Sequence, residues 1–161
     1  MQQAPIKLYI FDADGTLRRS TVPARPCPNR PGDWELIPGV KERLAEIDWG
    51  PGRAHYAIAS NQGGVGLGYL TLAMARRLLE EMAVAAFDQP PPAGSIELCP
   101  HAPHAGCPCR KPKPEMLTRL MRRFRASKDE TLFVGDTESD EEAARHAGVR
   151  FIRAEEFFGW Q

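Results

Sequence analysis

Short apolar runs alternate along the chain with longer amphipathic segments, and this pattern predicts strands and helices in turn. The runs have the length and residue types of buried strands, and the first of them ends abruptly in two aspartates. We predict strands at residues 6–11, 55–60, 95–98, 131–134 and 149–152.

The segments between these runs carry apolar residues at helical spacing. Pro38 suits the first turn of a helix, and Val40, Leu44 and Ile47 follow it at the spacing i, i+4, i+7. Further helices are predicted at residues 71–87, 114–124 and 138–147.

Two capping residues mark helix boundaries, because Thr71 is a candidate N-cap and Gly148 is expected to end the last long helix. Residues 18–37 are different: they are rich in proline and arginine and show no clear periodicity. They also hold Cys27, to which we assign no role. The arginines of this segment either bind substrate or belong to a solvated loop, and the second interpretation is favoured for Arg18, Arg19, Arg25 and Arg30.

The alternation of strands and helices indicates an α/β protein. Repeated βα units favour a parallel sheet covered by helices on both faces, which is a three-layer α/β/α, Rossmann-like arrangement. We find no internal repeat and no sign of a second domain. The 161 residues are therefore expected to form one domain that spans residues 1–161.

Composition narrows the function classes. Basic and acidic residues number 21 each, so the net charge supports neither a nucleic-acid binder nor a membrane-surface protein. No apolar stretch is long enough to span a bilayer, and the N-terminus lacks the pattern of a signal peptide. We expect a soluble, monomeric, cytoplasmic protein, in which the four cysteines do not form disulfides.

Polar side chains gather where predicted strands end. Asp12 and Asp14 follow the first strand, Ser60 and Asn61 end the second, and Asp136 follows the fourth. In a parallel sheet these ends lie side by side, so residues far apart in sequence converge on one crevice. A capped turn with solvated acids would explain one such cluster, but it does not explain clusters at several equivalent positions.

The two carboxylates after the first strand suggest a division of labour. Asp12 is the candidate nucleophile that becomes an aspartyl-phosphate, and Asp14 is the candidate proton donor and acceptor. Lys111, directly before a helix, can neutralise charge on a transferring phosphoryl group. The candidate phosphate-binding residues are Thr16, Ser60, Asn61 and Arg110.

So many acids in one crevice would repel a phosphate dianion unless a cation is present. Mg²⁺ prefers carboxylate oxygens, waters and substrate phosphate as ligands. Its expected ligands are the side chains of Asp12 and Asp136 and the backbone carbonyl of Asp14, with Asp140 behind them.

A second metal is indicated by a loop in which three cysteines fall within eleven residues. Cys99, His101, Cys107 and Cys109 offer three thiolates and one imidazole, a closed set suited to structural Zn²⁺. His104 is an alternative to His101. Buried reduced cysteines are disfavoured, because proline and glycine make this segment a loop rather than a core element.

The ordered motifs resemble those of the haloacid dehalogenase (HAD) superfamily of phosphatases. They are Asp-Ala-Asp-Gly-Thr-Leu at 12–17, Ser60-Asn61, Lys111, and Gly-Asp-Thr-x-x-Asp at 135–140, which together cover nearly the whole chain. The resemblance implies a Rossmann-like fold, dependence on Mg²⁺ and phosphomonoester hydrolysis through Asp12. No insert is long enough for a separate cap domain, so the crevice should be open.

The cysteine loop resembles that of heptose 1,7-bisphosphate phosphatases and histidinol-phosphatases, whose pattern favours His101 as the zinc ligand. Two departures concern a second phosphate. Those enzymes usually have an arginine where this chain has Ala13, and the heptose enzymes tend to have an Arg-Gly pair where this chain has Leu67 and Gly68. A missing arginine removes a bidentate phosphate contact.

A phosphatase acting on a small phosphorylated substrate is therefore expected, and a sugar phosphatase of the D,D-heptose 1,7-bisphosphate type is the preferred reading. Three alternatives stay open: a histidinol-phosphatase, a polynucleotide 3′-phosphatase, and a non-enzymatic module that binds phosphate or metal.

Overall fold

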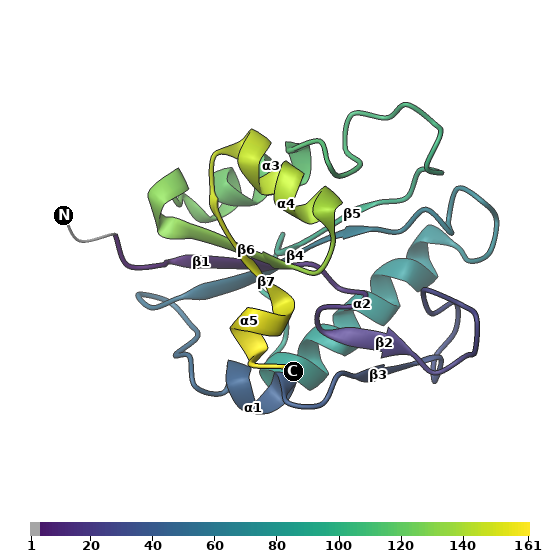
Figure 1. Ribbon diagram of the computed structural model, residues 1–161, viewed down its shortest axis with the longest axis horizontal. Helices are drawn as coiled ribbons and strands as arrows, with labels where there is room; N and C mark the ends of the chain where they lie inside the picture. The colour runs from purple at the N-terminus through teal and green to yellow at the C-terminus, as the bar shows by residue number, and fades with distance from the viewer. Residues whose placement is uncertain (1–3) are drawn as a thin grey trace.

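The computed structural model describes residues 4–161, and its centre is a five-stranded parallel sheet (Figure 1). The expected domain span of 1–161 includes residues 1–3, which lie outside the described residues. The strand order is β5-β4-β1-β6-β7, so the first strand lies in the middle. In its register, Ile10 of β1 pairs with Ala57 of β4 on one side and with Phe133 of β6 on the other. The strands are β1 (Leu8–Phe11), β4 (His55–Asn61), β5 (Ile96–Cys99), β6 (Thr131–Gly135) and β7 (Arg150–Arg153).

All five predicted strands are present, with ends that differ from the prediction by one or two residues. The predicted helices are also present, and Thr71 and Gly148 cap them as expected. The Thr71 hydroxyl accepts a hydrogen bond from the Met74 amide at 3.0 Å, and Gly148 ends its helix with a φ of 78°. The helices are α1 (Val40–Leu44), α2 (Leu72–Phe87), α3 (Glu115–Phe124) and α4 (Glu138–Ala147).

The first helix is shorter than its apolar spacing suggests. Val40 and Leu44 are buried as expected, but α1 ends at Leu44, and Ile47 packs against the core from the turn that follows. Two short elements were not predicted from the sequence: a 3₁₀ turn at Lys128–Glu130 and the terminal helix α5 (Ala154–Phe158).

The segment 18–37 is not an irregular loop. Its ends form β2 (Arg18–Ser20) and β3 (Trp34–Leu36), which pair antiparallel with Arg19 opposite Glu35. Three-residue strands are too short to show periodicity, and their pairing joins positions separated by the whole loop 21–33, so no local pattern predicts it.

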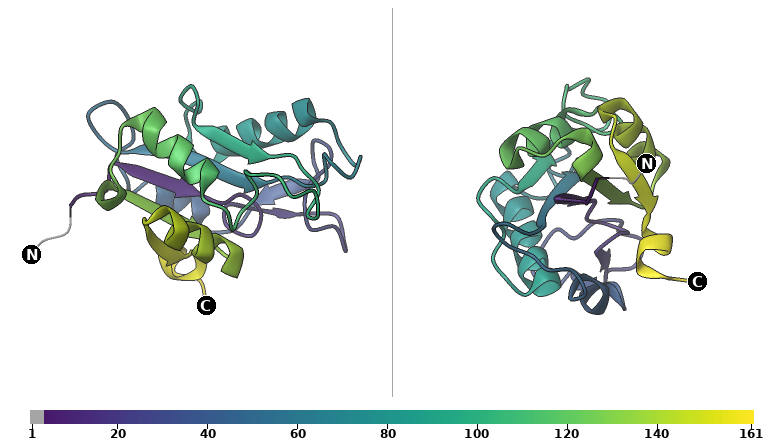
Figure 2. Two further views of the ribbon diagram at one scale, coloured as in Figure 1. Left: turned by 90° about the horizontal axis from the view of Figure 1, so that it is seen from above. Right: turned by 90° about the vertical axis from the view of Figure 1, so that its left-hand side faces the viewer.

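Helices cover both faces of the sheet, which confirms the three-layer fold (Figure 2). On one face, Phe11 and Ile58 pack with α1, α2 and α5, and on the other, Ile10 and Ala57 pack with α3 and α4. Successive strand residues point to opposite faces, so both must be apolar in a sheet that is buried on both sides. No separate cap domain occurs within residues 4–161.

The loops that follow the strands gather at one end of the molecule, away from the N-terminus. Figure 1 shows the β2–β3 hairpin, the loop after β4 and the loop after β5 at this end. The polar residues singled out in the sequence belong to these loops and to the strand ends beneath them. Among the described residues, no helix is both long enough and apolar enough to cross a membrane.

Candidate active site and cysteine cluster

A buried cluster of ion pairs lies at the C-terminal end of β1, the central strand of the sheet. The ammonium group of Lys111 donates to Asp12 Oδ1 at 2.7 Å, to Asp140 Oδ1 at 2.7 Å and to the carbonyl oxygen of Ala59 at 2.8 Å. All three hydrogens of the ammonium are therefore used, and the Lys111 side chain is almost fully buried. The structure brings together residues that are 99 positions apart in sequence.

Asp12 and Lys111 influence each other's protonation strongly. Burial raises the pKa of Asp12 well above its usual value, the charges of Asp140 and Asp136 add to this rise, and Lys111 opposes it. Burial would lower the pKa of Lys111, but Asp12 and Asp140 together raise it. The cluster contains more carboxylates than cations, which favours the entry of a further cation.

Asp136 approaches Asp12 from the end of β6. The hydroxyl of Thr16 lies 3.3 Å from Asp12 Oδ2 and 3.2 Å from Asp136 Oδ1, so it bridges the two carboxylates. The approach requires a glycine at position 15: a Cβ there would lie 2.0 Å from Asp136 Oδ2, and the φ of Gly15 is 87°.

Asp140 is fixed by the first turn of α4. Its Oδ2 accepts hydrogen bonds from the backbone amides of Asp136 and Thr137, both at 3.2 Å, while its other oxygen contacts Lys111. The Thr137 hydroxyl accepts from the Asp140 amide, which completes a capping box. Ligand atoms of Asp12, Asp136 and Asp140 lie within 4.8 Å of one another, so the three carboxylates suit a divalent cation.

Asn61 contacts the backbone of Lys111 rather than an open crevice. Its side-chain amide donates to the Lys111 carbonyl at 3.2 Å and accepts from the Lys111 amide at 3.0 Å. Ser60 is buried beside it, and its hydroxyl accepts a hydrogen bond from Gln62 Nε2 at 2.7 Å. The two candidate phosphate-binding residues of β4 thus have protein partners in this structure.

Asp14 is held by side chains that sequence analysis did not connect with it. Arg18 Nε donates to Asp14 Oδ1 at 2.8 Å and Arg18 Nη2 to Oδ2 at 3.2 Å, and Gln62 Nε2 donates to Oδ2 at 2.9 Å. The expectation that Arg18 is solvated is therefore wrong, because its side chain is 1% exposed. The glycine turn after Asp14 brings the strand back onto it, and a sequence separation of four does not reveal this.

The other arginines of residues 18–37 agree better with the expectation that they belong to a solvated loop. Arg19 pairs with Glu35 on the surface, Arg25 pairs with Asp33, and Arg30 is exposed. Cys27 lies near Asp14: burial raises the pKa of its thiol to about 12, and the negative charge of Asp14 contributes.

A cavity of about 350 Å³ opens between the hairpin loop and the loop after β4. Cys27 lines it, which places the cavity on the Asp14 side of the carboxylates, and its wall includes the exposed side chains of Leu67 and Tyr69. A larger cavity, of about 670 Å³, lies around Lys7 and His55 at the opposite ends of the strands, away from the carboxylates.

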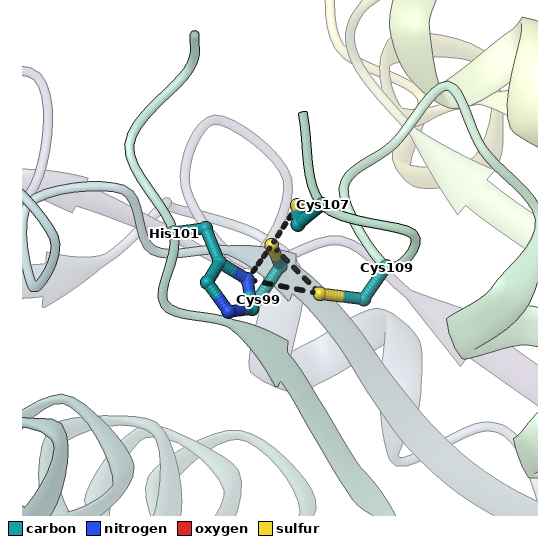
Figure 3. Close-up of side chains that lie close together, drawn as sticks. All are labelled: Cys99, His101, Cys107 and Cys109. Carbon is teal, nitrogen blue, oxygen red and sulfur yellow. Dashed lines mark hydrogen bonds between the residues drawn. The ribbon is translucent and has the colours of Figure 1, made fainter. Parts of the chain in front are cut away.

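Cys99, the last residue of β5, converges with Cys107 and Cys109 of the following loop, as the sequence indicates (Figure 3). Cys109 Sγ lies 3.0 Å from Cys99 Sγ and 3.2 Å from His101 Nδ1, and Cys99 Sγ lies 3.4 Å from Cys107 Sγ. These sulfur separations exceed the roughly 2.0 Å of a disulfide. His101 completes the group, and all four donor atoms lie within 4.8 Å of one another.

Cys99 and Cys109 are buried against the core beside α3, and the four donor atoms together suit a tetrahedral metal ion. Burial raises the pKa of the Cys109 thiol to about 12, an effect that a bound cation reverses by stabilising the thiolate. Three sulfurs and one imidazole nitrogen leave no open position for chemistry, so this group suits a structural ion. Arg110 and Lys111 follow Cys109 directly, and one terminal nitrogen of Arg110 is buried without a hydrogen-bond partner among the described residues.

Comparison with known proteins agrees with this geometry. The family model of haloacid dehalogenase-like hydrolases matches residues 107–154. The D-glycero-β-D-manno-heptose-1,7-bisphosphate 7-phosphatase of Pseudomonas putida is 32% identical over 147 residues, which cover 90% of this chain and 80% of that enzyme. The chain belongs to the heptose-bisphosphate phosphatase family of the HAD superfamily. It is therefore a phosphatase.

Solved structures of the superfamily share its fold. The crystal structure of the D,D-heptose 1,7-bisphosphate phosphatase from Bordetella bronchiseptica, complexed with magnesium and phosphate, matches with a TM-score of 0.74 and 30% identity, over 91% of this chain and 79% of that one. A HAD-like phosphatase structure from Mesorhizobium loti matches with a TM-score of 0.67 at 19% identity, over 99% and 86% of the two chains, and shows the shared fold.

Within this HAD phosphatase, sequence reasoning found the carboxylates, Lys111 and the cysteine cluster, but it missed two partners of Asp14. Gln62 follows the Ser60-Asn61 motif directly, so its position was a usable signal. For Arg18 no such signal exists, since the arginines around it are exposed or pair at the surface.

Proposed function

We propose that this phosphatase hydrolyses phosphomonoesters in a Mg²⁺-dependent reaction through a phosphorylated Asp12, and that its substrate is a sugar bisphosphate of the heptose 1,7-bisphosphate type. The observation that carries the mechanism is the pairing of Asp12 with Lys111 at 2.7 Å, beside the carboxylates of Asp136 and Asp140. The names of the relatives support the substrate.

Asp12, Asp136 and the backbone carbonyl of Asp14 would hold Mg²⁺, with Asp140 behind them. When bound, Mg²⁺ supplies positive charge that offsets the carboxylates and the substrate phosphate. The ammonium of Lys111 is already in contact with the nucleophile, so it offsets charge that develops on the phosphoryl oxygens.

In the first step an Asp12 oxygen attacks phosphorus and forms a P–O bond while the bond to the leaving oxygen breaks. Asp14, protonated at this stage, gives its proton to that leaving oxygen. In the second step the Asp14 carboxylate takes a proton from water, the water oxygen attacks phosphorus, and the bond to Asp12 breaks. Inorganic phosphate leaves and Asp14 is protonated again.

The residues around the cluster position these groups. Thr16 bridges Asp12 and Asp136, and Asn61 fixes the backbone of Lys111. We assign phosphate binding to Thr16, Ser60, Asn61 and Arg110, and the unpartnered nitrogen of Arg110 supports this for Arg110. The leaving group would occupy the cavity beside Cys27, which is large enough for a sugar.

The cluster of Cys99, His101, Cys107 and Cys109 would hold a structural Zn²⁺ that anchors the segment leading to Arg110 and Lys111. Thiolate ligands of this kind persist in a reducing compartment, which supports a cytoplasmic location for the protein.

The direct test is a comparison of kcat/KM for heptose 1,7-bisphosphate, histidinol phosphate and a 3′-phosphorylated oligonucleotide at the same Mg²⁺ concentration. We expect turnover that requires Mg²⁺, is absent in Asp12→Asn, and is highest for the bisphosphate. Because the chain has Ala13 and Leu67 where arginines are usual, the advantage of the bisphosphate over the other two substrates should be small, below about a hundredfold. A preference for either of the other two substrates would overturn the sugar assignment.

A further inference from the structure

Arg18 has an unusual place in the fold. It is the first residue of β2, its side chain is 1% exposed, and it has the largest side chain among the fully buried residues described. Its neighbour Arg19 is 53% exposed and pairs with Glu35 at the surface. Because strand residues alternate between faces, only one of the two arginines is directed inward, and that one contacts Asp14.

The contact constrains the whole carboxylate. Arg18 uses Nε for one oxygen of Asp14 and Nη2 for the other, at 2.8 and 3.2 Å, so the planar guanidinium aligns the planar carboxylate. Gln62 adds a third hydrogen bond at 2.9 Å and is itself held by the Ser60 hydroxyl at 2.7 Å. Asp14 is thus fixed between the hairpin and the end of β4.

Stability does not explain this arrangement. Arg18 Nη1 is buried without a hydrogen-bond partner among residues 4–161, and an unpaired buried donor is unfavourable. Apolar residues of similar volume often replace buried ion pairs without loss of stability. The burial of the guanidinium is therefore better explained by its contact with the Asp14 carboxylate.

We infer that Arg18 is a positioning residue that, together with Gln62, fixes the Asp14 carboxylate in the orientation required for proton transfer to the leaving group. The inference rests on the proposed role of Asp14. Loss of the guanidinium removes the two hydrogen bonds that Arg18 donates to Asp14 and keeps the one from Gln62, so the carboxylate is no longer held at both oxygens and can rotate. A misplaced proton donor can lower a rate by about a hundredfold.

Two substrates of nearly the same shape distinguish positioning from folding. 4-Nitrophenyl phosphate releases a stable anion that needs no proton, whereas phenyl phosphate releases a more basic oxygen that benefits from one. The constant kcat/KM reports the step in which the leaving group departs, so the ratio of the two values measures proton transfer. A variant that merely lowers the fraction of folded enzyme changes both values equally.

The experiment measures this ratio in the wild type, Arg18→Met, Arg18→Lys and the matched control Arg19→Met. In Arg18→Met we expect kcat/KM for phenyl phosphate to fall on the order of a hundredfold, and by at least about tenfold more than for 4-nitrophenyl phosphate. Arg18→Lys keeps the charge but can contact only one oxygen of Asp14, so its ratio should lie between those of the wild type and Arg18→Met. Arg19→Met should keep the wild-type ratio.

An unchanged ratio in both Arg18 variants would overturn the inference. A larger loss of kcat/KM for 4-nitrophenyl phosphate than for phenyl phosphate would overturn it as well. If Arg18→Met does not fold, Arg18→Lys decides alone. Asp14→Asn separates this result from the proposed mechanism: if its ratio also stays at the wild-type value, Asp14 is not the proton donor and the mechanism fails. If Asp14→Asn shifts the ratio and the Arg18 variants do not, only the inference about Arg18 fails.

Discussion

The side-chain amide of Asn61 forms two hydrogen bonds with the backbone of Lys111. It donates to the carbonyl oxygen at 3.2 Å and accepts from the amide at 3.0 Å. The two residues are 50 positions apart, at the end of β4 and at the end of the cysteine loop. These two hydrogen bonds hold the backbone of Lys111 against the end of β4. They thereby help to place its ammonium between Asp12 and Asp140.

Asn61→Ala should therefore displace Lys111 without removing any charge. We expect kcat/KM for 4-nitrophenyl phosphate to fall about a hundredfold, since a displacement of about 1 Å is enough for such a loss. Asn61→Asp keeps the acceptor oxygen for the Lys111 amide and loses the donor, so its kcat/KM should fall less than that of Asn61→Ala. An alanine variant with wild-type kinetics would show that the amide is dispensable for the position of Lys111.

Gly15→Ala tests the close approach of Asp136. A Cβ at position 15 would lie 2.0 Å from a carboxylate oxygen of Asp136, and the left-handed backbone there adds strain. Gly32 is a matched control, because its φ of 88° is nearly the same and a Cβ there meets nothing within 4 Å.

We expect Gly15→Ala to lose nearly all activity, because Asp136 must move away from Asp12. Gly32→Ala should lose only roughly 1–2 kcal/mol of folding free energy, the strain of the positive φ, and should keep its kcat. Activity assays and thermal unfolding of both variants decide the point, and equal behaviour of the two would contradict the proposed crowding.

Zinc content tests the cysteine cluster. Elemental analysis of protein purified without chelators should find about one zinc ion per chain, the capacity of a single four-ligand site. Cys107→Ser should lose the metal and unfold at a lower temperature, because metal binding and local folding are linked. Cys27→Ser lies outside the cluster and should keep its zinc. Absence of zinc from the wild type, or its retention in Cys107→Ser, would exclude the site.

The sequence predicted what depends on local pattern. Apolar runs located the sheet, and Asp12 and Asp136 could be placed at its edge because each directly follows a run that has the character of a strand. The cysteine cluster was predictable because its four members are close in sequence. Each of these features is contained in a short stretch of residues.

What depends on non-local pairing was missed. The β2–β3 hairpin joins strands separated by the loop 21–33, so the burial of Arg18 could not be read from residues 18–37. The role of Asn61 depends on a partner 50 residues away, and its amide suits a phosphate oxygen as well as a backbone. The partner that such a side chain contacts is determined only when the whole fold is assembled.

In the proposed mechanism Asp12 carries the phosphoryl group during turnover. The most direct measurement uses Asp14→Asn with 4-nitrophenyl phosphate and Mg²⁺, followed by an acid quench and peptide mass spectrometry. This substrate needs no proton to leave, but the second step needs the Asp14 carboxylate, so a phosphorylated protein should accumulate. We expect one phosphoryl group on Asp12 and none in the double variant that also carries Asp12→Asn. A phosphoryl group on another residue, or rapid turnover with no covalent adduct, would contradict it.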